Sequence, residues 1–437
     1  MTDAPTITPV DEVPAGSRFS RLLALEPGEV RCPFGAYAEL RETGPVVWSE
    51  RLNAFVVSRY EDIRDILRDP VTFSSAHASG SSSVTSLAQR VMDNPDFPDD
   101  VRRQAARRLR LSQSPVLLNA DPPVHKRHRG LVSHAFTPRR VNQMEPMFQR
   151  ITDELIDAFA GKGRAELISE FALPLPMTVI AGILGVPPRM MRTFKKWSGA
   201  FTRGVGALEL PHEEICELFR SVGEFYDYFG EQLDIRRTEP ADDLLTDLLE
   251  ARLDGEQPLT QDEILQMLVQ FLIGGNETTT NLIAGVMTHL LRDAALLERV
   301  TADPELIPNL VEECLRLEAP TQGMFRTTTT DTEIGGRAIP ENSMVFLLYA
   351  SGNRDVREFA DPDTVELTES RKHHLAFGRG EHVCIGANLA RRETIVAVRT
   401  LLGRLHDIAP AVDLDQLQYH PTFILRGPKE LRITFSG

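Results

Sequence analysis

The longest helical pattern in the sequence runs without a break from residue 259 to residue 293. Apolar residues recur in it at intervals of three and four, and Thr260 and Glu263 have the spacing of a capping box at its start. At about 1.5 Å per residue, such a helix is about 50 Å long. A helix of this length crosses the whole body of a chain of 437 residues, so the other elements must pack around it.

Most of the remaining segments also have the helical period, and strand signals are few and short. Gly335-Gly336 between two strand-like runs is typical of a primed hairpin turn. No repeat or long Ser/Gly linker divides the sequence. We therefore expect a flexible arm over residues 1–20 and a single domain over residues 21–437, mainly α with a minor antiparallel β part. Helices are clearest at 60–69, 148–161 and 311–319, and hairpins at 45–58, 330–351 and 423–435.

The composition argues against several classes of protein. Apolar residues make up 42% of the chain, but no apolar run reaches the roughly 18 residues that a membrane span requires. The net charge of −15 disfavours a nucleic-acid binder, which needs a basic surface. The N-terminus lacks the basic and then apolar order of a secretion signal. We therefore expect a cytoplasmic monomer with no membrane anchor and no nucleic-acid partner.

The four cysteines lie far apart in the sequence and form no CxxC pair, which argues against a zinc ribbon. Nothing in the sequence indicates an oxidising compartment, so disulfides are not expected. Cys216 and Cys314 are expected to be small buried side chains. The full set is Cys32, Cys216, Cys314 and Cys384.

Cys384 differs from the other cysteines because it lies in a glycine-rich run directly before a long helical pattern. Gly378 and Gly380 permit a backbone turn that residues with side chains disfavour. The free N–H groups and the positive dipole end of a helix start favour a thiolate, and a thiolate is a strong ligand for iron. For an isolated cysteine, a buried structural role is the commoner alternative. The run reads FGRGEHVCIG, residues 377–386.

This run resembles the haem-binding loop of the cytochrome P450 family, the haem-thiolate monooxygenases, whose pattern is F-G-x-G-x-H-x-C-x-G. All six defined positions match. The resemblance extends from about residue 45 to the end of the chain. It implies that Cys384 is the axial ligand of the iron of haem b, and that backbone N–H groups after Cys384 donate hydrogen bonds to the sulfur. It also places Phe377, Gly378 and Gly386 in the cofactor-binding loop.

The middle of the long helical pattern contains residues that weaken a helix, namely two glycines followed by three threonines. Gly274, Gly275 and Thr278 are three or four positions apart and therefore share a face with little side-chain bulk. A flat ligand could approach closely there, and the Thr278 hydroxyl could bond back to the helix backbone. The alternative is a glycine pair that permits close helix packing.

In the cytochrome P450 family the corresponding helix binds oxygen and has the pattern A/G-G-x-D/E-T. Here the pattern reads Gly274-Gly275-Asn276-Glu277-Thr278. The resemblance implies that Thr278 holds water or oxygen by hydrogen bonds and that Glu277 passes protons to it from solvent. Family members that use hydrogen peroxide directly tend to lack this acid–alcohol pair. Its presence therefore favours a reaction driven by a reductase.

A buried haem has two propionates that need cationic partners. His125 and Arg129 are four positions apart, behind two prolines that suit a helix start. The resemblance assigns these two residues, together with Arg326 and His382, to propionate binding. The alternative for this region is a solvated basic face, which we expect for its other basic residues, Lys126, Arg127 and His128.

Glu313 and Arg316 match the E-x-x-R pair of the family, which implies a buried structural ion pair that supports the cysteine loop. By itself this spacing carries little information, because exposed pairs three residues apart are common. The family usually adds an arginine from a run before the haem loop. Here Glu369 stands at the expected position, and either Arg371 or Arg354 could substitute for it.

The region between residues 125 and 140 contains five Lys or Arg residues and no Asp or Glu. In the resembled fold this region, with Arg391 and Arg392, lies on the face nearest the sulfur, where basic residues would steer an acidic electron carrier. No GxGxxG unit is present, so the reductase is expected to be a separate protein. We predict a ferredoxin partner, with a flavodoxin as the alternative, and Arg127 and Arg140 as docking residues.

The sequence therefore predicts a monooxygenase in which one atom of O₂ enters a mainly apolar small organic substrate and the other leaves as water. A peroxide-driven or coupling haem enzyme, and a haem sensor or carrier without turnover, remain alternatives. Glu277 and Thr278 argue against a carrier, which needs no proton relay. The stretch 79–116 is expected to be a long loop with a helix inside. Apolar side chains available for substrate, each of which could equally be core, are Leu272, Met324, Phe325, Phe423 and Ile424.

Overall fold

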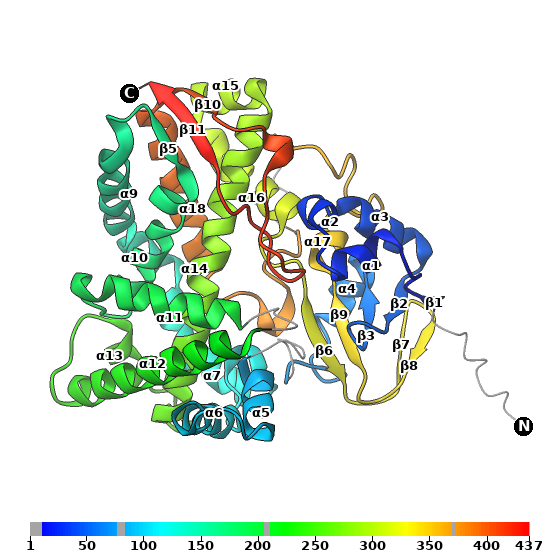
Figure 1. The fold of residues 1–437 in the computed structure, drawn as a ribbon, viewed down its shortest axis with the longest axis vertical. Coiled ribbons are helices and arrows are strands. Elements are labelled where there is room, and N and C mark those ends of the chain that lie inside the picture. Colours follow the sequence, from blue (N-terminus) through cyan, green and yellow to red (C-terminus); the bar gives the residue numbers. More distant parts are fainter. Residues whose placement is uncertain (1–10, 77–83, 205–209, 369–372, 437) are drawn as a thin grey trace, which may run out of the picture.

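The computed structural model describes residues 11–76, 84–204, 210–368 and 373–436. Helices dominate, and the strands form a six-stranded sheet and two smaller ones. Figure 1 shows α9 to α14 and α18 gathered on one side, and the strands of the large sheet with α1 to α4 on the other. The prediction of a mainly α chain with a minor β part is confirmed. The helices are α1 Arg18–Leu23, α2 Pro27–Arg31, α3 Phe34–Thr43, α4 Tyr60–Ile66, α5 Val84–Asp93, α6 Asp99–Ser112, α7 Val124–Val132, α8 Pro138–Gln143, α9 Glu145–Ala160, α10 Pro174–Ile183, α11 Met191–Arg203, α12 His212–Thr238, α13 Leu244–Glu250, α14 Gln261–Arg292, α15 Ala294–Ala302, α16 Ile307–Glu318, α17 Tyr349–Gly352 and α18 Ala387–Arg404.

Helix α14 is the long central helix that the sequence predicts. It begins with a capping box in which the Thr260 hydroxyl accepts from the Glu263 N–H, while the Glu263 carboxylate accepts from the Thr260 N–H. Its second half is buried on nearly all sides because α10, α11, α16 and α18 pack around it. The largest hydrophobic core lies among these helices, and two smaller cores lie on the sheet side.

The large sheet has the order β1-β2-β3-β9-β6-β4 and combines antiparallel pairs with two parallel ones, β1–β2 and β3–β9. Two hairpins follow the sequence predictions. β2 pairs antiparallel with β3, and β7 with β8, where Gly335 and Gly336 have φ of 54° and 79° in the predicted primed turn. The strands are β1 Asp11–Glu12, β2 Val46–Ser49, β3 Ala54–Val57, β4 Phe73–Ser74, β5 Arg164–Glu166, β6 Met324–Thr328, β7 Thr332–Ile334, β8 Arg337–Ile339, β9 Met344–Leu347, β10 His406–Pro410 and β11 Arg432–Ser436.

The hairpin predicted at 423–435 is wrong. Only β11 forms from this stretch, and it pairs with β10 and β5 instead of with the preceding residues. The Arg426 side chain turns inward to Glu318 and to the carbonyls of Val30 and Arg31. Pro428 has no N–H to donate to a strand partner. These contacts hold the chain before β11 in an irregular path.

Two further expectations need correction. The stretch 79–116 contains two helices, α5 and α6, instead of one, because each buries an apolar stripe and they pack against each other. Residues 11–20 do not form an arm, since β1 pairs with β2 and Phe19 is buried. The rest of that arm, residues 1–10, lies outside the described residues. The single domain over 21–437 stays a prediction.

None of the helices in the described part of the chain combines the length and the apolar character needed to cross a membrane.

Candidate functional site

The segment that carries Cys384 turns tightly before α18. Gly378 and Gly380 have φ of 65° and 69°, in the left-handed region that favours glycine, and a Cβ on Gly380 would clash with the Leu67 carbonyl. The turn is closed by the Cys384 N–H, which donates to the Phe377 carbonyl at 2.9 Å. The two glycines therefore permit the turn that the sequence predicts.

Burial raises the pKa of the Cys384 thiol, whereas the Gly386 N–H and the guanidinium groups of Arg129 and Arg391 lower it. Burial has the largest effect, so the pKa of this thiol lies above its ordinary value in the protein chain alone. The N–H contact from Gly386 agrees with the predicted hydrogen bond to the sulfur. Although protein atoms surround the thiol closely enough to raise its pKa, the Cys384 side chain remains accessible from one side, unlike Cys216 and Cys314, which are buried as expected.

Four basic side chains from three separate parts of the chain converge beside the segment that carries Cys384. His125 and Arg129 come from α7 and Arg326 from β6, and His382 lies two residues before Cys384. The ring centroids of His125 and His382 are 4.0 Å apart. Burial, followed by the charges of His125, Arg326 and Arg129, lowers the pKa of His382 to about 3. The structure thus brings the four predicted residues together.

In this cluster the acidic groups Glu381 and Asp121 act on His125, but no acidic group is among those that shift the pKa of His382. Burial also lowers the pKa of His125 and of Arg129, and the groups that shift the pKa of His382 are all basic. The Nε2 atom of His382 is buried and has no hydrogen-bond partner among the described residues. A buried polar atom without a partner is costly. The cluster would therefore be stabilised by bound carboxylates.

The middle of α14 has an accessible strip formed by Gly274, Glu277 and Thr278, which we call the open strip. A Cβ on Gly274 would meet no atom within 4 Å, so there is open space beside it. The Thr278 hydroxyl donates to the Gly274 carbonyl at 2.6 Å, as the sequence predicts. Gly275 instead faces Ile180 of α10 at 3.5 Å, which fits the alternative of close helix packing.

Glu277 is half-buried, and burial raises its pKa. No hydrogen bond or ion pair joins its carboxylate to another described residue. A carboxyl group without partners in a poorly solvated position retains its proton at a higher pH than an exposed one. This property suits a group that takes up and releases protons.

Glu313 and Arg316 form a fully buried bidentate ion pair, with distances of 2.9 Å from Arg316 Nε to Glu313 Oε1 and 2.8 Å from Nη2 to Oε2. The remaining Arg316 N–H groups donate to the carbonyls of Asn353, Pro362 and Thr364. The Asn353 side chain in turn accepts from the Leu375 N–H at 2.6 Å. Through Asn353, the pair supports the segment that leads to Cys384.

The sequence allows either Arg354 or Arg371 as the third member of this ion-pair network. Arg354 is directed elsewhere, since it donates to the Leu317 carbonyl, pairs with Asp363 and lies over the Phe34 ring. Arg371, like Glu369, lies outside the described residues.

Glu312 is a residue beside the site whose contacts sequence reasoning missed. Its buried carboxylate contacts Arg391 of α18 and His374 of the cysteine segment. Burial raises its pKa, but the hydrogen bonds from His374 and Arg391 outweigh burial and lower the pKa to about 2. Arg391 also lies over the Phe377 ring, 4.5 Å from its centroid. Glu312 thus contacts the chain on both sides of Cys384, at His374 before it and at Arg391 after it. In the sequence, only its position next to Glu313 could have indicated this role.

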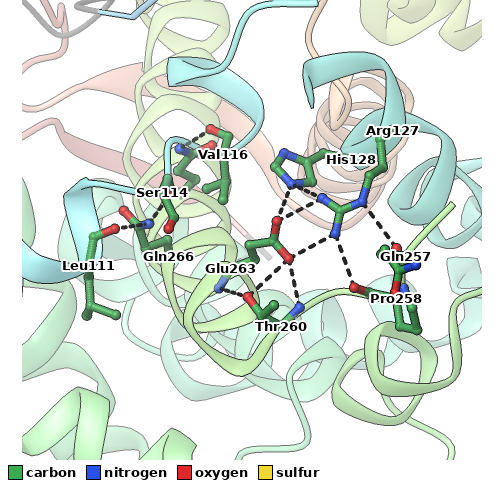
Figure 2. A network of polar contacts seen from close by, with 11 residues as sticks. Leu111, Ser114, Val116, Arg127, His128, Gln257, Pro258, Thr260, Glu263 and Gln266 are labelled. Carbon is green, nitrogen blue, oxygen red and sulfur yellow. Dashed lines mark hydrogen bonds and ion pairs between the residues drawn. The ribbon is translucent and has the colours of Figure 1, made fainter. Parts of the chain in front are cut away.

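The basic residues predicted to dock an electron carrier are largely neutralised within the chain. Arg127 makes two hydrogen bonds to Glu263, of 2.8 and 3.1 Å, and His128 is fully buried against the same carboxylate (Figure 2). Arg140 pairs with Asp242 and Asp247. The expectation of a solvated face is therefore wrong for Arg127 and His128, because a carboxylate distant in sequence reaches them. Arg391 and Arg392 pair with Glu312 and Glu145.

Most of the apolar side chains considered for substrate binding belong to the core. Met324 alone among them is partly accessible. The others are at most 5% exposed and pack within the hydrophobic clusters: Leu272, Phe325, Phe423 and Ile424.

Comparisons with known proteins agree on one family. Residues 211–435 match the family model described as "Cytochrome P450". Cytochrome P450 107B1 of Saccharopolyspora erythraea is 36% identical over 419 residues, which are 94% of this chain and 97% of that protein. The 6-deoxyerythronolide B hydroxylase of the same organism is 34% identical, over 92% of this chain and 96% of that protein. The solved structure of cytochrome P450 CYP109Q5 from Chondromyces apiculatus is similar with a TM-score of 0.81 and 38% identity, covering 94% of this chain and 97% of that one.

Proposed function

The chain belongs to the cytochrome P450 family, and from this premise we propose that it hydroxylates a mainly apolar small organic molecule with electrons from NAD(P)H, passed through a ferredoxin reductase and a ferredoxin. The coarser part of this statement follows from the family: the protein is an oxidoreductase, a cytochrome P450 monooxygenase, and its cofactor is haem b. The substrate class, the electron carrier and the roles of individual residues are the proposal.

The residues of the site fit a haem group. Cys384 offers an accessible sulfur for the iron. The basic cluster of His125, Arg129, Arg326 and His382 offers donors for two propionates, and the unpartnered Nε2 of His382 is the observation that calls for such an acceptor. Further residues that would line the cofactor are Phe377, Gly378 and Gly386 on the cysteine side, and Gly274 and Gly275 on α14.

One observation carries the proposed reaction: the open strip of α14 combines free space with a hydroxyl and an unpartnered acid. When bound, the haem supplies the activation of dioxygen. The hydroxyl proton of Thr278 is directed to the Gly274 carbonyl, so its oxygen lone pairs remain available to accept a hydrogen bond from water. The raised pKa of Glu277 makes this carboxyl a proton donor at a pH where ordinary glutamates are ionised. Together they would pass protons to the reacting centre.

Replacing either residue is expected to separate electron consumption from product formation. In Glu277→Gln and Thr278→Ala we expect hydroxylated product per NAD(P)H to fall about 10²-fold, the lower range for loss of acid–base catalysis. NAD(P)H consumption should continue, because neither residue takes part in electron delivery. The measurement is product formed per NAD(P)H oxidised, with a substrate found by titrating a compound library against the absorbance change of the iron spin state.

Thr288→Ala is the matched control, because Thr288 also bonds back to its own helix, at 2.8 Å to the Ala284 carbonyl, but is buried away from the open strip. The ratio of product to NAD(P)H should not change in this variant.

Since burial raises the pKa of Glu277, the ionised form disfavours folding, and this cost appears as pH rises through the raised pKa. Glu277→Gln should therefore gain melting temperature over the wild type at high pH and lose that gain as pH falls. Turnover with peroxide and none with the ferredoxin chain would contradict the proposed electron supply.

Electron delivery is expected to depend on Lys126 and Arg139 instead of on Arg127 and Arg140. Lys126 and Arg139 are exposed, and no ion pair joins either of them to another described residue. Lys126 lies on α7 between His125 and Arg129. Charge reversal, Lys126→Glu with Arg139→Glu, should slow reduction by an acidic ferredoxin about tenfold and flatten its salt dependence. Stopped-flow reduction at several salt concentrations measures this.

The matched control is Arg164→Glu, which reverses an exposed arginine on β5, in the small sheet that also contains the C-terminal strand β11. Its reduction rate should equal that of the wild type. Equal rates for the double Lys126 and Arg139 variant and the wild type would refute this docking surface.

A further inference from the structure

Three polar residues on one face of α14 hold the chain that leads into α7. Glu263, Gln266 and Gln270 are spaced by three and four residues and so lie in a row. Figure 2 shows Glu263 directed at Arg127 and His128, and Gln266 directed at Leu111 and Ser114. We call Glu263, Gln266 and Gln270 the anchor row. All of its partners named here lie between residues 111 and 128.

Gln270 makes the most constrained of these contacts. Its Nε2 donates to the Val116 carbonyl at 2.9 Å, and its Oε1 accepts from the Leu118 N–H at 3.1 Å. The residue between these two partners, Leu117, is buried and has a φ of 41°. This left-handed conformation is disfavoured for a residue with a branched side chain. The amide of Gln270 therefore bridges a strained residue on both sides.

Glu263 extends the same connection to α7 itself. Its carboxylate accepts from Arg127 and contacts the buried His128, while Arg127 also donates to the carbonyls of Gln257 and Pro258 before the helix. Burial raises the pKa of Glu263, but the hydrogen bonds from Arg127, the Thr260 N–H and His128 outweigh burial and lower it to about 2. The Glu263 carboxyl therefore stays ionised at a pH below the ordinary pKa of a glutamate.

The anchor row continues along its face into the open strip. Gly274 follows Gln270 by four residues, and Glu277 follows Gly274 by three. One helix face thus first holds the 111–128 chain and then presents the reacting groups. Strained residues that persist because neighbours hold them tend to lie at functional sites. The strain at Leu117 therefore calls for a reason.

We propose that Gln270 is a positioning residue: by holding Val116 to Leu118 in the strained form, it sets the entry of the chain into α7 and so the placement of His125 and Arg129 relative to the open strip. This inference rests on the proposed function in one respect, the binding of the haem propionates by His125 and Arg129. Gln270 itself acts through the backbone of residues 116–118.

The test uses the haem-loaded enzyme with Gln270→Leu, which keeps the side-chain size but makes neither hydrogen bond. We expect the amides of residues 118–120 to exchange hydrogen about tenfold faster, the loss expected when buried hydrogen bonds are removed. Haem transfer to an excess of apomyoglobin should accelerate about tenfold, the lower end of the effect of losing an outer contact around a metal site. Gln270→Glu, which retains the acceptor for Leu118 but not the donor for Val116, should give an intermediate result.

Gln149→Leu is the matched control, since Gln149 also sits on a helix and bonds two partners, Asp153 and Thr400. It should leave both rates unchanged.

A second comparison tests the strain itself. With Gln270 present, Leu117→Gly should melt about 2 °C above Leu117→Ala, because only glycine accepts the left-handed form without cost. When each is combined with Gln270→Leu, the glycine variant should no longer melt above the alanine variant, since residue 117 is then free to relax.

The outcomes separate this inference from the proposed function. Suppose that the wild type shows a thiolate-type carbon monoxide spectrum. If hydrogen exchange and haem transfer in Gln270→Leu then equal those of the wild type, the positioning role is overturned and the proposed function stands. A wild type that lacks this spectrum would overturn the proposed function. Faster exchange in Gln270→Leu with unchanged haem transfer would limit Gln270 to local structure and also overturn the positioning role.

Discussion

Cys384→Ala is expected to abolish the thiolate-type carbon monoxide spectrum of the reduced, haem-loaded protein, and with it all measurable hydroxylation. An alanine offers no atom to the iron, and the electron density that a thiolate donates to bound oxygen is lost. The two buried cysteines cannot replace it. Cys314 is fully buried on α16, where burial raises its pKa well above the ordinary value, and Cys216 is buried on α12. Absorbance of the reduced protein under carbon monoxide measures the effect.

Cys216→Ala provides the control for this experiment, because it removes a buried cysteine with no predicted contact to the cofactor. Its spectrum should match that of the wild type. The Cys384 assignment would be refuted by a Cys384→Ala protein that retains haem and still shows the thiolate band. Loss of the band in both variants would point to a folding defect instead, which melting curves of the two proteins would show.

Arg316→Met is expected to lower the free energy of unfolding by about 3–5 kcal/mol, the usual cost of breaking a buried ion pair. The reason is that Glu313 would lose its cationic partner in a site where both side chains are almost fully buried. The carbonyls of Asn353, Pro362 and Thr364 would also lose their donors. Against a total stability of about 5–15 kcal/mol, this loss is large. Denaturant unfolding followed by circular dichroism, with haem content measured in parallel, checks the prediction.

Two variants define what the Arg316 result means. Arg150→Met removes an exposed pair, 2.7 Å from Glu154 on α9, and should change stability by at most about 0.5 kcal/mol. The double variant Glu313→Leu with Arg316→Met should lose less than Arg316→Met alone, because no uncompensated charge then remains buried. A double variant as unstable as the sum of the two single ones would show that packing, and not the buried charge, explains the loss.

The elements that sequence reasoning predicted well are those whose cause is local. The capping box of Thr260 and Glu263 and the primed turn at Gly335-Gly336 depend on neighbours a few residues away, so the sequence shows them directly. The hairpin expected at 423–435 failed because its outcome depends on Arg426, whose partners Glu318 and Val30 lie more than 100 residues away. A period-2 pattern describes only which faces could pair, and tertiary contacts decide which strands do.

By itself, the sequence determined the family and the long central helix, since short-range spacing specifies turns and caps, and it predicted which residues carry the chemistry. Only the tertiary structure decided which charges remain available. From the sequence, Arg127 and His128 were expected to lie on a solvated basic face. In the fold, the carboxylate of Glu263, 136 and 135 residues further along, contacts both of them. The physical reason is that a charge is free or neutralised according to what lies within a few ångströms of it, and the fold, not the order of residues, sets those distances.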